Sequence, residues 1–392
     1  MTQLRIDDMF GAPRPPPSET RPNARADRND HKAKPRNPSP QRPPEKLAKD
    51  SPRRASNRAL AEENGRLTKR GYDVGNVHVD LQAYVARCKR LTRSYTVDDT
   101  ERILTKQRAL PHTTTTTFEV SSESSMAAAQ RLAGHRTSTS TSGASSSACT
   151  SAPSNGRVCV LNFASARHVG GGYLTGAKAQ EEDVCRVSGL YSSLLCAPDF
   201  YAAHKARGAE NLRYSHRMVY SPDVPVFRDA DRKSASGGSA GAAGASTSGS
   251  SPANAANGAG SSSRTPTQST TSTTSGNALL PRPYMVDILT SPAPNATALR
   301  QNLPSAASNL EGILKERAGR ILALALEHGA ETIVLGAWGC GVFGNDLGTV
   351  LGVFKGWLEG ELGGRFAKVV WAMNDDKGAG RALQAFPSAT RV

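Results

Sequence analysis

Two adjacent glutamates follow a glycine triplet at a spacing that suits acid–base chemistry. The acidic segment 180–183 (Gln-Glu-Glu-Asp) begins eight residues after the last glycine of Gly170-Gly171-Gly172. A positioned glutamate can donate a proton to a reacting group or remove one from it. A structural interpretation is also open, because acidic side chains in a first helical turn interact favourably with the helix dipole. Adjacent helical residues point about 100° apart, so Glu181 and Glu182 cannot reach the same atom; if both are functional, one positions and the other transfers a proton.

Two glycine-rich loops each follow an apolar run that predicts a buried strand. The first loop spans residues 162–173, and the second spans residues 336–346 and leads into a helix expected from about 346 to 362. Glycine lets backbone N–H groups approach a ligand closely, and a strand, a glycine loop and a helix N-terminus together can hold a diphosphate. Tight-turn chemistry alone can explain such loops, and neither the Walker pattern nor the G-x-G-x-x-G pattern is present. The pairing of two loops at strand ends favours a ligand site.

Strands and helices alternate around these loops. We therefore expect an α/β fold with a central, largely parallel or mixed sheet between helices. The expected strands are 116–120, 157–163, 217–220, 284–289, 332–335 and 367–372. The expected helices are 55–70, 78–91, one from a Ser122 cap to Leu132, and one through 310–324 that ends at Gly329.

Composition separates this fold from segments that cannot form a core. Residues 1–52 hold 11 of the 24 prolines, and residues 1–60 carry 14 Lys/Arg against 7 Asp/Glu. Low-complexity inserts are expected at 137–156 and 229–279, and 1–52 is expected to be a disordered basic tail. The rest of 53–385, roughly 260 residues, suits one large domain. The net charge of +15 suggests an acidic partner, although a solubilising tail explains it equally well.

Cysteine usage and hydropathy limit the remaining classes. The six cysteines include no C-x-x-C pair, which argues against a zinc site or a disulfide scaffold and fits a reducing compartment. No run of about 18 apolar residues is present, and the N-terminus lacks the apolar core of a signal peptide. We therefore expect a soluble, intracellular protein that needs no metal and no cofactor.

The combination of motifs resembles a known family. Gly170-Gly171-Gly172 followed by Gln180-Glu181-Glu182 resembles the signature of poly(ADP-ribose) glycohydrolases. Residues 161–165, 181–186 and 336–345 look like the microbial (bacterial and fungal) type, and the resemblance extends over about 55–380 without the inserts. It implies a three-layer α/β/α macrodomain-like fold with N-terminal accessory helices. It also implies hydrolysis of the ribose–ribose O-glycosidic bonds of ADP-ribose polymers, with release of ADP-ribose.

The resemblance also assigns roles to residues. Glu182 would be the general acid and base, Glu181 would hold the ribose hydroxyls, and Asn162 would orient the scissile ribose. Phe343 would press the distal ribose into place. The glycines expected to line the diphosphate are Gly170, Gly171, Gly172, Gly339 and Gly341, and the other expected substrate-binding positions are Gln180, Cys340, Val342 and Asn345.

The N-terminus carries a second motif. Gln3, Ile6, Met9 and Phe10 resemble the sliding-clamp (PCNA) binding peptide, with Met9 in place of the usual aromatic residue. A tethering peptide of this kind would lie on an extended tail. The motif, together with the basic tail, favours a nuclear protein of the DNA damage response; a cytoplasmic location is the alternative.

Three other functions remain open on the sequence. The same fold can read ADP-ribose without cleaving it, although a pure reader has no use for an adjacent glutamate pair. A clamp-associated DNA-repair factor would fit the tail. A magnesium-dependent ADP-ribosyl hydrolase of another fold fits less well, because no carboxylate cluster has suitable spacing.

Overall fold

A mixed sheet forms the centre of the structure, a computed structural model that describes residues 51–134, 156–205, 212–230 and 277–392. Within these residues the strand order is β10-β4-β9-β8-β5-β7-β6-β3. Strands β10 to β7 run parallel, and β6 and β3 run antiparallel to their neighbours. The bounds are β3 (Arg93–Tyr95), β4 (Thr117–Ser121), β5 (Arg157–Phe163), β6 (Met218–Arg228), β7 (Leu279–Ser291), β8 (Ala330–Leu335), β9 (Lys368–Ala372) and β10 (Thr390–Arg391).

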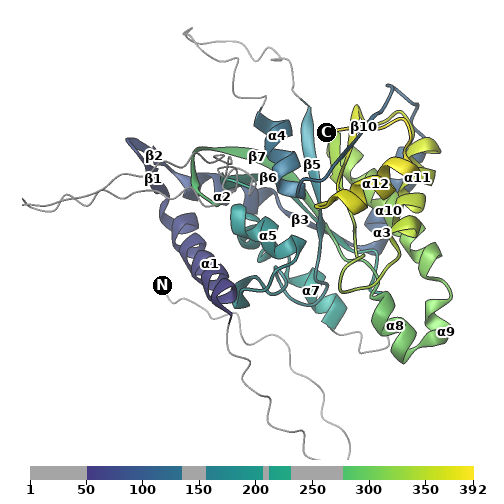
Figure 1. Cartoon of the computed structure of the whole chain (residues 1–392), viewed down its shortest axis with the longest axis horizontal. Coiled ribbons are helices and arrows are strands. Elements are labelled where there is room, and N and C mark those ends of the chain that lie inside the picture. Colours follow the sequence, from purple (N-terminus) through teal and green to yellow (C-terminus); the bar gives the residue numbers. More distant parts are fainter. Residues whose placement is uncertain (1–50, 135–155, 206–211, 231–276) are drawn as a thin grey trace, which may run out of the picture. The chain divides into compact units, whose positions relative to one another are not determined.

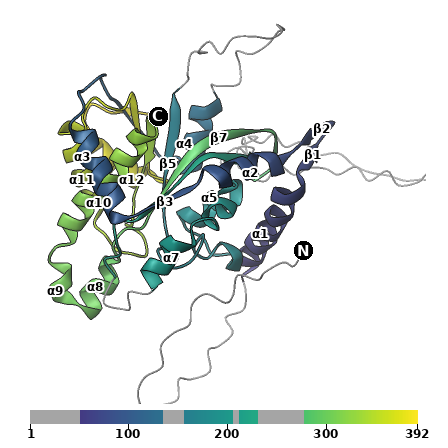
Figure 2. The same ribbon diagram turned by 180° about the vertical axis from the view of Figure 1, so that it is seen from behind.

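Alternating side chains of the sheet face two different helical layers. In β5, Val158 and Val160 pack in one apolar cluster, whereas Cys159 and Leu161 pack in the other. The first layer contains α1 (Pro52–Arg70), α2 (Leu81–Leu91), α4 (Ser125–Gly134), α5 (Gln180–Val187), α6 (Leu190–Leu194) and α7 (Pro198–Lys205). The second contains α3 (Val97–Arg108), α10 (Leu310–Glu327), α11 (Leu347–Glu359) and α12 (Asp376–Ala385). Figures 1 and 2 show the strands between α1 and α5 on one side and α10 and α11 on the other, so the three-layer α/β/α fold is confirmed.

The N-terminal accessory helices are present, with one boundary shifted. Helix α1 begins at Pro52, where Ser51 caps it, and α2 begins at Leu81 with Asp80 as its cap. The expected start at residue 78 is wrong, because Val77–Val79 is strand β2, paired with β1 (Tyr72–Val74). Gly75 in the connecting turn has a φ of 58°, which glycine adopts readily.

Other elements differ from expectation for local reasons. Helix α3 was not expected, although Thr96 and Asp99 form a reciprocal capping box at its start. Ser122 does not cap α4; instead the Ala127 N–H donates to Ser124 Oγ at 3.2 Å. Strand β6 runs on to Arg228 past a register shift after Ser221. The short helices η2 (Tyr173–Thr175), α8 (Ala296–Asn302) and α9 (Pro304–Ala307) complete the described elements.

The folded domain has slightly different limits from the expected range of 53–385. Strand β10 pairs with β4 beyond residue 385, and β7 begins at Leu279, the last residue of the expected insert 229–279. Ser51 and Pro52, which were expected in the tail, cap and begin α1. The rest of the tail and nearly all of both inserts lie outside the described residues. Within the described ranges, no helix is long and apolar enough to cross a membrane.

Candidate active site

Helix α5 places the two glutamates at the carboxyl end of β5. The helix starts at Gln180, so Glu181 and Glu182 lie in its first turn, as expected. Gln180 connects helix and strand: its Nε2 donates to the Leu161 carbonyl at 2.9 Å, and its Oε1 accepts from the Phe163 N–H at 2.9 Å. Its amide is therefore engaged by the chain itself. These hydrogen bonds give Gln180 a positioning role, and its expected contact with substrate stays a prediction.

Glu181 is almost completely buried and bound on both oxygens. It is 2% exposed, accepts from the Ser165 N–H at 2.8 Å through Oε2 and from Asn162 Nδ2 at 3.2 Å through Oε1. Burial raises the pKa of Glu181 to about 8; the Ser165 and Asn162 hydrogen bonds oppose the increase, and the charge of Glu182 adds to it. Glu181 is thus a carboxyl group whose protonation is balanced near neutral pH.

Glu182 differs from Glu181 in having one oxygen without a partner. Its Oε1 accepts from the Gly172 N–H at 2.7 Å, and it is 7% exposed. Its Oε2 is buried and has no hydrogen-bond partner among the described residues. A buried polar atom without a partner is costly unless a ligand or water satisfies it. Among the four oxygens of the glutamate pair, this one is therefore the oxygen that no described protein group occupies.

The glycine triplet lies directly against both carboxylates. A Cβ on Gly171 would lie 2.5 Å from Glu182 Oε1 and 3.0 Å from Glu181 Oε2, and the φ of Gly171 is 59°. As expected, the two glutamates bind different atoms: Glu181 accepts from the Ser165 N–H, and Glu182 accepts from the Gly172 N–H. Both nevertheless border one glycine, because the loop after β5 folds back over the start of α5.

Helix α1 contacts the segment 164–179 between β5 and α5, the catalytic loop, from its outer side. Arg54 Nε donates to the Thr175 carbonyl at 2.9 Å, and Asn57 Nδ2 donates to the Gly176 carbonyl at 3.2 Å. Deeper in the protein, Asn64 Nδ2 donates to the Arg186 carbonyl at 2.8 Å. The accessory helix therefore fixes the segment between the glycine triplet and α5, and these contacts were not expected from the sequence.

Asn162 and Asn345 serve mainly to hold other groups. Asn162 is fully buried on β5, and its amide donates to Glu181 and, at 3.2 Å, to Thr290 Oγ1. Asn345 Nδ2 donates to the carbonyls of Pro294 at 2.9 Å and Gly339 at 3.0 Å, which closes the second loop on itself. The side-chain oxygens of Asn162 and Asn345 are buried without a partner among the described residues, so the expected contacts of both residues with substrate stay predictions.

The second glycine loop leaves β8 beside the end of β7. Trp338 is buried and donates from Nε1 to the Ser291 carbonyl at 3.0 Å, and the Phe343 carbonyl accepts from the Thr297 N–H at 3.0 Å. Val342 is 87% exposed and Phe343 is half-buried. Helix α11 follows where a helix was expected; it is capped by Asp346 and ends at Glu359, short of the expected residue 362. Cys340 is half-buried, and burial raises the pKa of its thiol to about 12, so it is a poor nucleophile.

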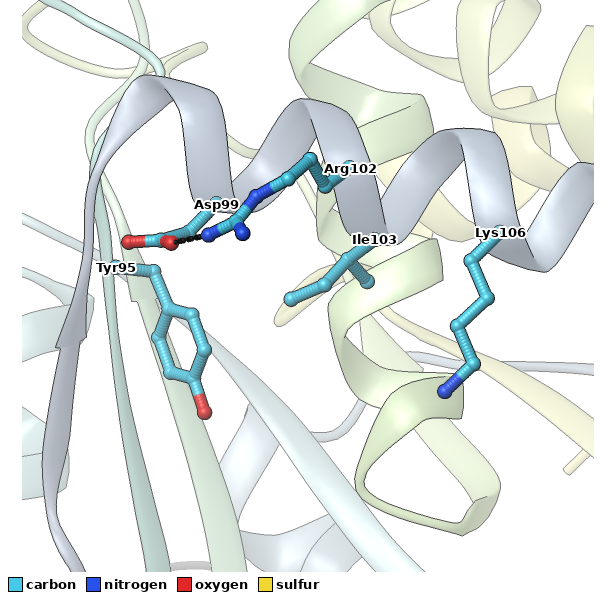
Figure 3. Close-up of a pocket in the computed structure, with 5 residues that line it drawn as sticks. All are labelled: Tyr95, Asp99, Arg102, Ile103 and Lys106. Atoms are coloured by element: carbon cyan, nitrogen blue, oxygen red, sulfur yellow. Dashed lines mark hydrogen bonds and ion pairs between the residues drawn. The ribbon is translucent and has the colours of Figure 1, made fainter.

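A shallow pocket elsewhere has no relation to these groups. It is lined by Tyr95, Asp99, Arg102, Ile103 and Lys106, from the end of β3 and along α3 (Figure 3). Figure 3 shows Asp99 and Arg102 turned toward each other, where they form an ion pair. None of these side chains belongs to either glycine loop, so the pocket does not form part of the candidate site.

The described residues contain no group of three or more His, Cys, Asp or Glu side chains that could hold a metal ion. The clamp-like peptide at Gln3, Ile6, Met9 and Phe10 lies outside the described residues and stays a prediction.

Similarity to known proteins agrees with this geometry. Residues 61–229 match the family model of the microbial-type PARG (poly(ADP-ribose) glycohydrolase) catalytic domain. A crystal structure of poly(ADP-ribose) glycohydrolase from Thermomonospora curvata is 35% identical, with a TM-score of 0.64, and covers 85% of this chain and 99% of that chain. The same enzyme bound to the inhibitor ADP-HPD is 36% identical over 85% and 98%, with a TM-score of 0.62.

A second bacterial structure is similar as well. Poly(ADP-ribose) glycohydrolase from Deinococcus radiodurans in complex with ADP-ribose is 33% identical, covers 78% of this chain and 98% of that chain, and has a TM-score of 0.58. A comparison with curated protein sequences gives no match. Identity above 30% over nearly the whole length of these structures, together with the glutamate pair and two glycine loops, establishes the family. The chain belongs to the microbial-type poly(ADP-ribose) glycohydrolases.

Proposed function

We propose that this chain hydrolyses the ribose–ribose O-glycosidic bonds of ADP-ribose polymers and releases ADP-ribose, with Glu182 as its general acid and base. One observation carries the assignment of Glu182. One carboxylate oxygen is fixed by the Gly172 N–H, and the other is buried without a partner among the described residues. This geometry presents a single oxygen for proton transfer in a site largely screened from water.

The chemistry follows from the bond to be broken. Cleavage of a glycosidic bond gives the sugar oxocarbenium character, and the departing ribose oxygen needs a proton. Glu182 supplies that proton through Oε2 and, as a carboxylate, then removes a proton from the incoming water. The Gly172 N–H holds Oε1 throughout and steadies the negative charge left on the carboxylate.

Glu181 is suited to a binding role. Both its oxygens already accept hydrogen bonds from Ser165 and Asn162. Because burial raises the pKa of Glu181 to about 8, its neutral form is favoured near pH 7, and a neutral carboxyl group can donate its O–H to a ribose hydroxyl and accept a bond from another. We therefore keep the assignment of the ribose hydroxyls to Glu181. Asn162 holds Glu181 through its amide N–H, and we keep its assignment to the scissile ribose because its side-chain oxygen is buried without a partner among the described residues.

We also assign the diphosphate to the glycines of both loops. The Gly171 and Gly172 N–H groups already donate to the His168 carbonyl and to Glu182 Oε1. The first loop therefore offers close backbone approach, and Gly339 and Gly341 of the second loop offer N–H groups.

The proposal is tested by release of ADP-ribose from a poly(ADP-ribosyl)ated protein in buffer that contains EDTA. Wild type should release ADP-ribose, and Glu182→Gln should be slower by at least about 10²-fold, as expected for loss of a general acid. Glu62→Gln is the matched control, because Glu62 is an exposed glutamate of α1. If wild type binds the polymer but releases nothing, the protein is a reader of ADP-ribose and the proposal is wrong. If EDTA abolishes release, the reaction depends on a metal and the mechanism is wrong.

The finer predictions of partner and location rest on the sequence alone. We propose a sliding clamp as a partner of the N-terminal peptide, and a nuclear site of action in the DNA damage response follows only if that contact exists. The relatives reported above are bacterial and lend the nuclear location no support. A peptide of residues 1–12 should bind an isolated clamp, and replacement of Ile6 and Phe10 by alanine should remove the binding. Equal binding of the clamp by the wild-type and the substituted peptide would refute the proposal that this motif binds a sliding clamp.

A further inference from the structure

Tyr214 has a backbone conformation that its residue type rarely adopts. Its φ is 54°, in the left-handed region. The other described non-glycine residues with a positive φ are Asp223, Asn277 and Asn374, whose short polar side chains tolerate it. A bulky residue in this region persists only when its surroundings impose the conformation, and such residues gather at functional sites. The constraint on Tyr214 therefore calls for a physical cause.

Two buried side chains from different helices fix this backbone. Arg317 of α10 is fully buried, and its Nη2 donates to the carbonyl groups of Arg213 at 2.9 Å and Tyr214 at 3.3 Å. On the other side, the Ser215 N–H donates to Nε2 of the buried His204 at 3.2 Å. Arg317 and His204 thus hold the backbone before β6, and this fixed backbone determines where the Tyr214 side chain points.

The Tyr214 ring contacts one residue from each glycine loop. Its centroid lies 5.9 Å from that of Phe343, with the rings tilted by 42°, and Phe343 belongs to the loop after β8. The guanidinium group of Arg167, in the loop after β5, lies 6.0 Å from the centre of the same ring. These separations are typical of an aromatic pair and of a cation–π contact. Tyr214 therefore connects the two loops that flank the candidate site.

We infer that Tyr214 is a positioning residue for substrate binding: its ring fixes Phe343 and Arg167, and so holds the two glycine loops at the separation that accepts the ligand. The inference rests on the proposed function only in taking ADP-ribose as that ligand. Tyr214 does not contact the glutamate pair through any described hydrogen bond, so its effect should fall on affinity and not on the chemical step.

The experiment compares substitutions that remove the ring with one that keeps it. Tyr214→Gly removes the ring and suits the left-handed backbone, and Tyr214→Asn is a second variant that also tolerates this φ. Tyr214→Phe keeps the ring. Asn374→Gly is the matched control, because Asn374 has a φ of 62° and is exposed after β9. The quantities measured are the Kd for ADP-ribose and the KM and kcat for poly(ADP-ribose).

The two ring-deleted variants should raise Kd and KM about three- to tenfold, the range that an aromatic pair contributes, and leave kcat within about twofold. Tyr214→Phe keeps the ring and loses only the hydrogen bond between the Tyr214 hydroxyl and Asn295, so its Kd should stay within about twofold of wild type, and Asn374→Gly should match wild type. In a Phe343→Leu background, removal of the Tyr214 ring should have a clearly smaller effect, because the contact through which it acts is already lost.

Three results would overturn the inference: an unchanged Kd in the ring-deleted variants, a Tyr214→Phe variant as weak as Tyr214→Gly, or effects of Tyr214→Gly and Phe343→Leu that simply add. The Kd measurement does not depend on turnover. If wild type binds ADP-ribose without releasing it from polymer, the proposed function fails, whereas the role of Tyr214 is still decided by these affinities.

Discussion

Replacement of Gly171 by alanine tests whether the glycine triplet is required by the positions of the two glutamates. The new methyl group would lie 2.5 Å from Glu182 Oε1 and 3.0 Å from Glu181 Oε2. Ordinary contact begins near 3.4 Å, so the Glu182 carboxylate must retreat by about 1 Å. Both carboxylates are buried, and Glu182 Oε1 is also bound to Gly172, so neither can move without losing a hydrogen bond.

Two separable costs follow from this geometry. The φ of 59° at Gly171 costs any other residue about 1–2 kcal/mol of stability. The displaced carboxylate lowers kcat, and a shift of about 1 Å in catalytic geometry can cost about 10²-fold. Gly75→Ala separates the two costs, because Gly75 has a φ of 58° and nothing lies within 4 Å of its added Cβ.

The assay measures kcat for ADP-ribose release and the free energy of unfolding for both variants. Each variant should lose about 1–2 kcal/mol of stability through its backbone. Only Gly171→Ala should lose activity, by about 10²-fold. If Gly171→Ala retains kcat within a few-fold of wild type, the carboxylate positions described above are not those used in catalysis.

Two further predictions concern the residues around Glu182. Because the folded-state pKa of Glu181 is raised from 4.5 to about 8, the folded state favours its neutral form. The free energy of unfolding should therefore fall by on the order of 4 kcal/mol as pH rises from about 4.5 to 8. Chemical unfolding at each pH should show this loss in wild type and not in Glu181→Gln. The same dependence of the free energy of unfolding on pH in both proteins would contradict the raised pKa. Gln180→Leu should cost about 1–3 kcal/mol of stability, because it leaves the Leu161 carbonyl and the Phe163 N–H unpaired, with no change in the Kd for ADP-ribose. A weaker Kd at unchanged stability would instead support the substrate contact expected from the sequence.

The sequence predicted the parts of the fold that depend on local pattern. The apolar run 157–163 is strand β5 at both boundaries, because a strand buried on both faces has few polar positions. Helix α11 begins at Leu347, next to the expected start at about 346. His78 and Val79 were assigned to a helix because the three residues of β2 are too few to show a strand period, and only the glycine turn before them signals a hairpin.

The sequence predicted which residues lie together at the site better than it predicted the hydrogen bonds that they form. Glu181 and Glu182 lie together in the first turn of α5, but their different environments come from the loop N–H groups of Ser165 and Gly172. Hydrogen bonds of this kind depend on how the loop folds back, which no spacing rule specifies. Tyr214 was missed entirely, since its contacts with Arg167 and Phe343 join segments far apart in the chain. The one available signal is a tyrosine in a polar segment just before a strand.

The contacts between α1 and the catalytic loop have a consequence for how this enzyme can be shortened. The family model begins at residue 61, inside α1, whereas Arg54 and Asn57, which hold Thr175 and Gly176, come before that point. A fragment that begins at residue 61 would keep both glutamates and lose the first turns of the helix that steadies the loop beside them. The minimal catalytic unit is therefore longer at its N-terminus than the family model indicates. A proteolytic cut or a splice junction between residues 54 and 61 would separate Arg54 from the rest of α1 and so weaken the contact of this helix with the catalytic loop.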